Sequence, residues 1–251
     1  MHILSIAIAS SAALMAAAVP ISKARAADRI ANIVLVHGAY ADGSGWQPVY
    51  ERLVKKGYKV SIVQEPETSL EEDVAAARRI IDLQDGPVVL VGHSWGGQVI
   101  TEAGTHDKVK ALVYIAALVP DVGESTSALQ EKIPPASTAI GPAPNGYLVI
   151  DPKRFHEDFA GDLPKDQAAF MAASQVLISQ KAVATPATAA AWKTKPSYGI
   201  VATKDRIINP DLERWMYKRA KAKITEIDSS HVVMISHPDK VADVIEDAAR
   251  Q

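Results

Sequence analysis

Residues 88–97 of the chain read Val-Val-Leu-Val-Gly-His-Ser-Trp-Gly-Gly. The four apolar residues at 88–91 predict a buried strand, and the stretch 95–104 predicts a helix. Between them lies Gly-x-Ser-x-Gly, with serine at position 94. A serine on such a strand-to-helix turn has its hydroxyl pushed out of the backbone, above a helix N-terminus that favours negative charge. We therefore predict that Ser94 is a nucleophile, since a glycine-rich turn with a chance serine would not need this strand and helix.

Strand-like and helix-like stretches alternate on both sides of this motif. Five further apolar runs are typical of strands covered on both faces: residues 33–36, 60–63, 109–116, 197–202 and 223–227. Helix-like stretches lie at residues 46–56, 70–83, 210–220 and 238–249. Ser69, with Glu72 three residues later, forms a capping box at the start of one of them. The alternation predicts an α/β fold with a doubly wound, mostly parallel six-stranded sheet.

The alternation stops between residues of about 120 and 195. This segment is rich in Pro, Ala, Ser and Thr, and it is too long for a simple connection. Helix-like pieces lie at 155–159 and 165–178, where residues such as Phe155 and Phe170 supply apolar faces. We expect an inserted helical cap with a proline-rich entry, and a disordered insertion is the alternative.

The first residues of the chain have the pattern of a signal peptide. Residues 3–19 form a nearly unbroken apolar run, and residues 24–26 read Ala-Arg-Ala, a small-residue cleavage pattern. We expect a signal peptide at 1–26 and a mature domain at 27–251, exported to a bacterial periplasm or secreted. His2 but no Lys or Arg precedes the apolar run, so an uncleaved anchor and a mis-assigned start codon are the alternatives. No later apolar run is long enough to span a bilayer, so we expect no stable membrane insertion after cleavage.

The composition excludes several classes of function. Basic and acidic residues, 27 and 29 in number, are mixed along the chain, so no basic block indicates nucleic acid as a partner. The absence of cysteine excludes disulfides, thiolate zinc sites and a cysteine nucleophile. Histidines and carboxylates show no metal spacing, and Ser44 stands where a phosphate-binding loop at 38–45 would need lysine. We therefore expect no metal, nucleotide or other cofactor.

A serine hydroxyl needs a base to take its proton, and two late histidines are candidates for that role. Where a serine lies on this kind of turn, the acid and then the histidine follow it along the chain. His231 follows the last predicted strand, where a loop should return over the carboxyl edge of the sheet. His237 lies at the start of the last helix, and we interpret it as a surface or capping residue. We predict that His231 is the base.

The acid that orients this histidine should follow the strand predicted at 197–202. Asp205 lies directly after that run. Asp211 is better explained by the first turn of the next helix, and Asp228 is too near His231 in sequence to come from a separate strand end. We therefore predict that Asp205 is the acid.

Two backbone N–H groups are expected to stabilise the oxyanion that forms when a serine attacks a carbonyl. One belongs to Trp95, the residue after the nucleophile, and the other to Ala39 in the loop after the first strand. Tyr40 and Trp95 are candidates to line the substrate pocket, and packing under the cap is the alternative for Trp95. His37 in the same loop is interpreted as structural rather than as a base.

Taken together, these motifs resemble the α/β-hydrolase superfamily. The matching segments are His37-Gly38-Ala39 with Gly43-Ser44-Gly45-Trp46, the motif at 92–97, Thr203-Lys204-Asp205-Arg206 and Ser230-His231-Val232. The resemblance spans nearly all of the predicted mature chain. It is closest to the small-cap branch that contains plant methyl esterases, hydroxynitrile lyases and bacterial esterases, and residues 151–159 look like the cap of bacterial members.

The resemblance implies a serine esterase that cleaves small-molecule carboxylic esters through an acyl-enzyme. Hydroxynitrile lyases of this branch usually carry lysine after the catalytic histidine, where this chain has Val232. Epoxide hydrolases and haloalkane dehalogenases use aspartate where this chain has Ser94. Lactone or amide hydrolysis, acyl transfer and perhydrolysis use the same triad and are the alternatives. A non-catalytic ligand-binding protein on the same fold is a further one.

Overall fold

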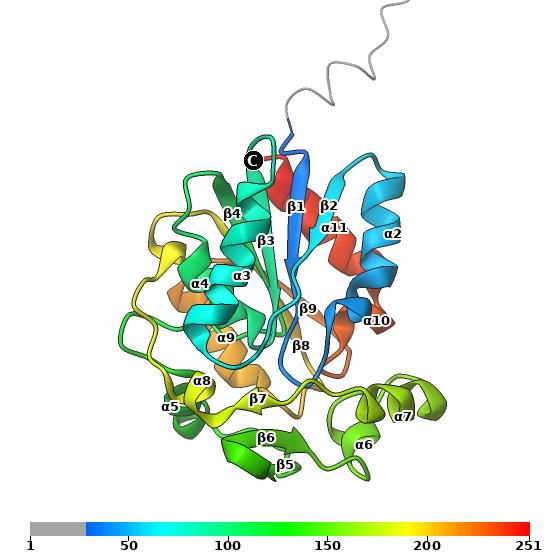
Figure 1. Ribbon diagram of the computed structural model, residues 1–251. Coiled ribbons are helices and arrows are strands. Elements are labelled where there is room, and N and C mark those ends of the chain that lie inside the picture. The colour runs from blue at the N-terminus through cyan, green and yellow to red at the C-terminus, as the bar shows by residue number, and fades with distance from the viewer. Residues whose placement is uncertain (1–28) are drawn as a thin grey trace, which may run out of the picture.

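Six parallel strands form the centre of the molecule in a computed structural model, which describes residues 29–251 (Figure 1). In sheet order they are β2 (Lys59–Ile62), β1 (Asn32–Val36), β3 (Val88–His93), β4 (Val109–Ile115), β8 (Ser197–Ala202) and β9 (Lys223–Ile227). All neighbouring pairs are parallel. The structure confirms the predicted doubly wound α/β fold, because each apolar run forms one strand of the sheet. The predicted signal peptide lies outside the described residues.

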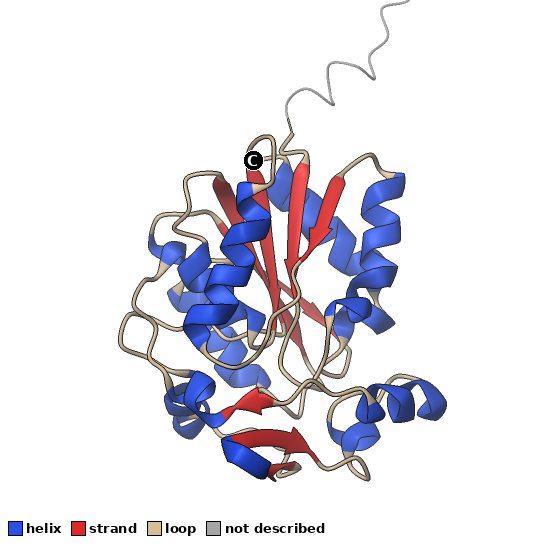
Figure 2. Ribbon diagram, in the orientation of Figure 1, coloured by secondary structure: helices blue, strands red, loops and turns tan. Residues whose placement is uncertain are grey.

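Helices cover both faces of this sheet (Figure 2). They are η1 (Gly43–Trp46), α2 (Gln47–Lys55), α3 (Leu70–Asp82), α4 (Gly96–Ala103), α9 (Pro210–Arg219), α10 (Val233–Ser236) and α11 (Pro238–Ala249). Helix α3 packs beside α4, and α2 packs beside α11 on the other face. The hydroxyl of Ser69 accepts the Glu72 N–H at 3.2 Å, which confirms the predicted cap of α3.

The most apolar strands lie between the two helical layers. Every residue of β1 and β3 is buried, which explains why these strands lack the alternation of a half-exposed sheet. Within the part of the chain that the structure describes, no helix has the length and apolar character needed to cross a membrane.

The order of the strands reverses next to β1. From β1 the chain passes to β2 on one side and then returns to β3 on the other. Val36 at the end of β1 pairs with Gly92 near the end of β3, so the loop after β1 emerges beside Ser94. Open α/β sheets bind ligands at such a reversal, at the carboxyl ends of the strands.

The segment between β4 and β8 forms a layer across these carboxyl ends (Figure 1). Its elements are α5 (Thr126–Lys132), β5 (Ile140–Ala143), η2 (Pro144–Gly146), β6 (Tyr147–Ile150), α6 (Phe155–Asp158), α7 (Lys165–Ala173), β7 (Ile178–Ser179), α8 (Gln180–Ala184) and η3 (Ala191–Lys193). The sequence predicts helices here, and the structure adds a three-stranded antiparallel sheet, β5-β6-β7.

Two local features explain this additional sheet. Asn145 and Gly146 turn the chain between β5 and β6 with φ values of 61° and 79°, and this dipeptide is a strong hairpin signal that the sequence analysis did not use. Helix α7 ends at Ala173, short of the expected residue 178, because Ile178 and Ser179 pair with β6 instead.

Candidate active site

Ser94 lies in a strained turn directly after β3. Its φ is +53°, in the left-handed region that residues with a side chain rarely adopt. Its N–H donates to the carbonyl of Ile115 at 3.2 Å, and its own carbonyl accepts the N–H groups of Gly97 and Leu118 at 3.0 and 3.2 Å. These three hydrogen bonds hold the turn in place at the N-terminus of α4.

Gly38 packs against this turn and has no room for a side chain. A Cβ there would lie 2.6 Å from Cβ of Ser94 and 2.8 Å from Nδ1 of His93. We expect Gly38→Ala to displace the loop after β1 and to lower kcat by about 10²-fold, the cost of moving a reacting group by about 1 Å. Steady-state assays beside Gly141→Ala, whose added Cβ meets nothing within 4 Å, check this. Equal kcat values for the two variants would contradict it.

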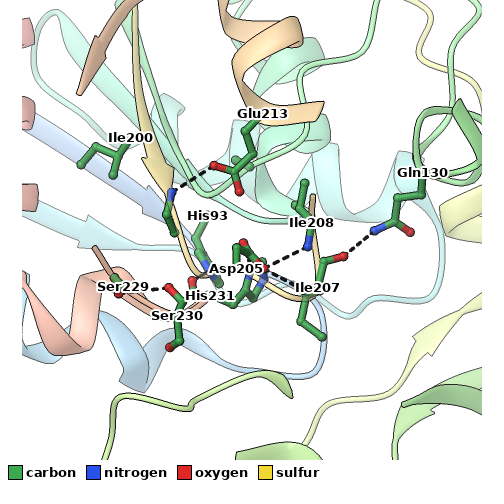
Figure 3. A network of polar contacts seen from close by, with 12 residues as sticks. His93, Gln130, Ile200, Asp205, Ile207, Ile208, Glu213, Ser229, Ser230 and His231 are labelled. Atoms are coloured by element: carbon green, nitrogen blue, oxygen red, sulfur yellow. Dashed lines mark hydrogen bonds and ion pairs between the residues drawn. The ribbon is translucent and has the colours of Figure 1, made fainter. Parts of the chain in front are cut away.

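Asp205 and His231 form a buried pair at the carboxyl ends of β8 and β9 (Figure 3). Nδ1 of His231 lies 2.6 Å from Oδ2 of Asp205. The other oxygen, Oδ1, accepts the N–H groups of Ile207 and Ile208 at 2.7 and 3.0 Å. Both carboxylate oxygens are therefore engaged, which fixes the carboxylate toward the imidazole. Because a carboxylate only accepts hydrogen bonds, Nδ1 carries a proton.

When the imidazole of His231 is neutral, a proton on Nδ1 leaves Nε2 free to accept one. Nε2 is buried, and it has no hydrogen-bond partner within residues 29–251. The structure therefore brings Asp205 and His231 into contact, whereas no hydrogen bond joins Ser94 to Nε2 in the described chain. Hydrogen bonds of catalytic groups often shorten only when substrate binds. A neutral imidazole with a free acceptor nitrogen is the form that a general base requires.

His93 connects the turn of Ser94 to the loop of His231. Its Nε2 lies 3.0 Å from the carbonyl oxygen of His231, and the two rings are 4.7 Å apart between centroids. The carbonyl can only accept, so Nε2 of His93 donates. Burial lowers the pKa of His93 well below 6.5, and the neighbouring His231 lowers it further. This role of His93 was not predicted from the sequence, where its only signal is the position directly before Ser94.

Two residues of the inserted segment complete the surroundings of His231. The ring of Phe159 packs edge-on against the imidazole, with centroids 5.0 Å apart. The carboxylate of Asp162 accepts the hydroxyl of Ser229 at 2.7 Å and the N–H of Ser230 at 3.0 Å. The insertion therefore fixes the loop that carries His231 and limits the access of water to its ring.

Ser94 lies on the wall of a cavity of about 110 Å³. Ala39, Tyr40 and Trp95 line the same cavity. The N–H groups of Ala39 and Trp95 donate to no backbone carbonyl within residues 29–251, so both are available to a ligand. The structure thus gathers the predicted nucleophile, oxyanion donors and substrate-binding residues around one space. The remaining wall is mostly apolar and includes Leu118, Ile140, Leu148, Val183, Ile207 and Ile208.

A group of buried acidic side chains lies behind this wall. The indole Nε1 of Trp95 donates to Oδ2 of Asp73 at 2.9 Å, so the ring is tied to α3. Glu65 and Glu67 are also buried, and their four carboxyl oxygens have no hydrogen-bond partner within the described residues. Burial and the charge of Asp73 raise the pKa of both glutamates well above 4.5, and burial raises the pKa of Asp73 to about 6.

His37 joins these acids to the loop after β1. The N–H of Glu65 donates to Nε2 of His37 at 3.0 Å, and Nδ1 lies 3.1 Å from the carbonyl oxygen of Gly38. Burial lowers the pKa of His37, so the ring is neutral at pH 7. With both nitrogens engaged, His37 holds the loop and is not placed to act as a base.

The buried carboxyl of Glu65 should make the stability of the fold depend on pH. Because folding raises its pKa above 4.5, the folded state keeps a proton that the unfolded state releases above that pH. The resulting stabilisation is complete below pH 4.5 and is lost as the pH rises, by up to about 1.4 kcal/mol per pH unit.

Glu65→Gln mimics the protonated, neutral carboxyl group of Glu65 and cannot ionise. We therefore expect the free energy of unfolding of this variant to fall less between pH 5 and pH 8 than that of the wild type. Urea unfolding at several pH values measures this difference. The control is Glu51→Gln, which changes an exposed residue and should keep the wild-type slope. A slope that Glu65→Gln leaves unchanged would mean that Glu65 is ionised in the folded protein.

Comparisons with known proteins agree with these motifs. The sequence pattern of the alpha/beta hydrolase family matches residues 33–244. A probable hydrolase, R7, from Phoma sp. is 28% identical over 240 residues, which cover 86% of this chain and 97% of that protein. A carbendazim hydrolyzing esterase from Nocardioides sp. is 36% identical over 127 residues, 44% of this chain and 52% of that protein. The crystal structure of a pyrethroid hydrolase from Sphingobium faniae JZ-2 has a TM-score of 0.74 and 24% identity, covering 87% of this chain and 96% of that one. The chain therefore belongs to the alpha/beta hydrolase family.

Proposed function

We propose that the protein hydrolyses carboxylic esters of small molecules, with Ser94 as nucleophile, His231 as general base and Asp205 as the orienting acid. The observation that carries this proposal is the buried Asp205–His231 pair, with its 2.6 Å contact and its free Nε2. This pair has the geometry of the acid–base half of a serine triad. The relatives named as esterase and hydrolase support the same reaction class.

In the proposed reaction, Nε2 of His231 takes the proton of the Ser94 hydroxyl while Oγ attacks the ester carbonyl. The N–H groups of Ala39 and Trp95 stabilise the negative charge on the carbonyl oxygen. His231 then gives its proton to the leaving alcohol, and the acyl group remains on Ser94. Water, deprotonated by the same Nε2, hydrolyses the acyl-enzyme and restores the serine. Asp205 stabilises the imidazolium in both halves of the reaction.

The cavity dimensions support a short, apolar acyl group at Ser94. About 110 Å³ is available there, well below the roughly 300–1,000 Å³ of sites for drug-sized ligands. A second cavity of about 300 Å³ is lined by Met171, Met234 and Ile235 among others, and Tyr40 lines both cavities. We place the acyl group in the smaller cavity, with Tyr40 limiting its length.

Hydrolysis and covalent labelling together test this function. Residues 27–251 are assayed with p-nitrophenyl esters of increasing acyl length, and a fluorophosphonate adduct is mapped by mass spectrometry. We expect release of p-nitrophenol, fastest for short acyl groups, and an adduct on Ser94. A primary alcohol added as acceptor detects acyl transfer through its ester product. A protein that neither hydrolyses these esters nor reacts with the phosphonate would contradict the proposal.

We also propose that the protein is exported and that residues 1–26 are removed. The apolar run at 3–19 and the Ala-Arg-Ala pattern at 24–26 support this. We expect the full-length gene product, expressed in a bacterial host, to leave the cytoplasm with Ala27 as its first residue. Intact mass measurement of the periplasmic and medium fractions checks this. A product that retains residues 1–26 would contradict it.

A further inference from the structure

Glu213 is an acidic residue buried beside the catalytic acid. It lies on α9, and its side chain is 0% exposed. Its Oε2 accepts the N–H of Ala202 at 3.1 Å, while its Oε1 has no hydrogen-bond partner within residues 29–251. Figure 3 shows the Glu213 side chain pointing from its helix toward the turn that carries Asp205. A buried carboxyl oxygen without a donor requires an explanation, because leaving such a group unpaired is costly.

The backbone of Ala202 links the Glu213 side chain to the backbone of Asp205. Its N–H donates to Glu213, and its carbonyl accepts the N–H of Asp205 at 3.0 Å. Asp205 is already committed as an acceptor, because it binds His231 through one oxygen and two backbone N–H groups through the other. If one carboxyl group of this pair carries a proton, it is therefore the one on Glu213.

The surroundings of Glu213 favour its neutral form. Burial raises the pKa of Glu213 well above 4.5, and the charge of Asp205 raises it further. The other titratable groups that face the pair are His231 beyond Asp205, and Tyr217 and Arg214 from α9. Burial keeps Tyr217 neutral by raising its pKa. Arg214 is 39% exposed and binds two surface carboxylates, so it does not neutralise a buried charge.

The geometry points to Glu213 as a positioning residue of the triad: it stays protonated and donates the hydrogen of Oε1–H to the carboxylate of Asp205. This inference rests on the proposed function of the Asp205–His231 pair. The added donor stabilises the charge of Asp205 without a cation. Asp205 is then held from the side of α9 as well as by the turn after β8. The hydrogen bond from Glu213 also makes the carboxylate of Asp205 a weaker acceptor for the imidazole proton.

This role predicts different effects for two substitutions. Glu213→Gln keeps a neutral side chain with one acceptor for Ala202 and one donor for Asp205. Glu213→Leu has a similar size but no donor, so Asp205 becomes more basic and holds the proton of His231 more tightly. We expect the pKa of His231 to stay within about 0.3 units in the glutamine variant and to rise by about 0.5 units or more in the leucine variant. We expect kcat to fall about 10-fold in the leucine variant only.

The test follows the proton between His231 and Asp205 directly. A proton in such a short, buried hydrogen bond gives a far-downfield proton resonance, assigned by its loss in His231→Gln, and its shift with pH reports the pKa of His231. This measurement needs no substrate, so it tests the role of Glu213 even if the ester assay fails. Absence of the resonance from the wild-type spectrum would instead count against the Asp205–His231 pair itself.

Two results would overturn the inference. A fall of the His231 pKa by about 1 unit in Glu213→Gln would show that Glu213 is ionised, because removing a negative charge destabilises the imidazolium. An unchanged pKa in Glu213→Leu, with only a lower melting temperature, would reduce Glu213 to a support for the backbone of Ala202. Should the leucine variant fail to fold, the glutamine variant alone still separates the protonated from the ionised state.

Discussion

Ser94→Ala is expected to lower kcat/KM for p-nitrophenyl acetate by at least about 10⁴-fold, the scale on which loss of a triad residue acts. The substitution removes the oxygen atom that forms the acyl-enzyme. Ser94 is only 6% exposed on this turn, so no other group can take the place of its hydroxyl. Residual activity of about 10³-fold over water should remain, because the N–H groups of Ala39 and Trp95 still bind the oxyanion. The side chain is small, so we expect the melting temperature to change little.

The control for this experiment is Ser127→Ala. Ser127 lines the same cavity, and its hydroxyl donates to the carbonyl of Val183 at 3.1 Å. Its loss should cost less than about 10-fold, as for a hydroxyl that contacts no reacting atom. If Ser94→Ala kept wild-type activity, Ser94 would not be the nucleophile. A strong loss of activity in Ser127→Ala alone would indicate that Ser127, and not Ser94, is the nucleophile.

The fold and the turn of Ser94 were predictable because their signals are local. The strand, the glycines and the helix lie within residues 88–104, and periodicity and turn chemistry indicate the same structure there. Asp205 and His231 are 26 residues apart, yet each follows a strand. Parallel strands bring their carboxyl ends to one edge, so the order of elements was enough to expect them near each other.

The remaining parts of the site depend on contacts between distant segments. Glu65 lies in a polar stretch that is typical of a solvated loop, and only the fold shows that His37, 28 residues earlier, buries it. Glu213 follows a normal helix start, and its acidic side chain is expected at the surface there. The fold instead places it against the backbone of Ala202. Burial of a charged group is set by tertiary packing, which periodicity in one stretch does not report.

The second large effect is expected for Asp205→Asn, which should lower kcat by about 10⁴-fold at pH 7. The carboxylate is fixed by two N–H groups on Oδ1, from Ile207 at 2.7 Å and Ile208 at 3.0 Å. The asparagine oxygen will therefore take that position, and its NH₂ group will face Nδ1 of His231. Two donors cannot share this contact, so the imidazole must move its proton to Nε2. An imidazole protonated on Nε2 cannot accept the proton of Ser94.

The matched control is Asp228→Asn, which removes a carboxylate three residues before His231 in the sequence. Asp228 is 70% exposed and pairs with Lys204 at the surface, so its loss should change kcat less than twofold. Steady-state kinetics of both variants at pH 7, with melting curves to confirm folding, decide between the two acids. A larger loss in Asp228→Asn would assign the acid to Asp228. Equal small losses would mean that His231 keeps its tautomer without a carboxylate, in which case the backbone around the ring, rather than Asp205, selects the nitrogen that carries the proton.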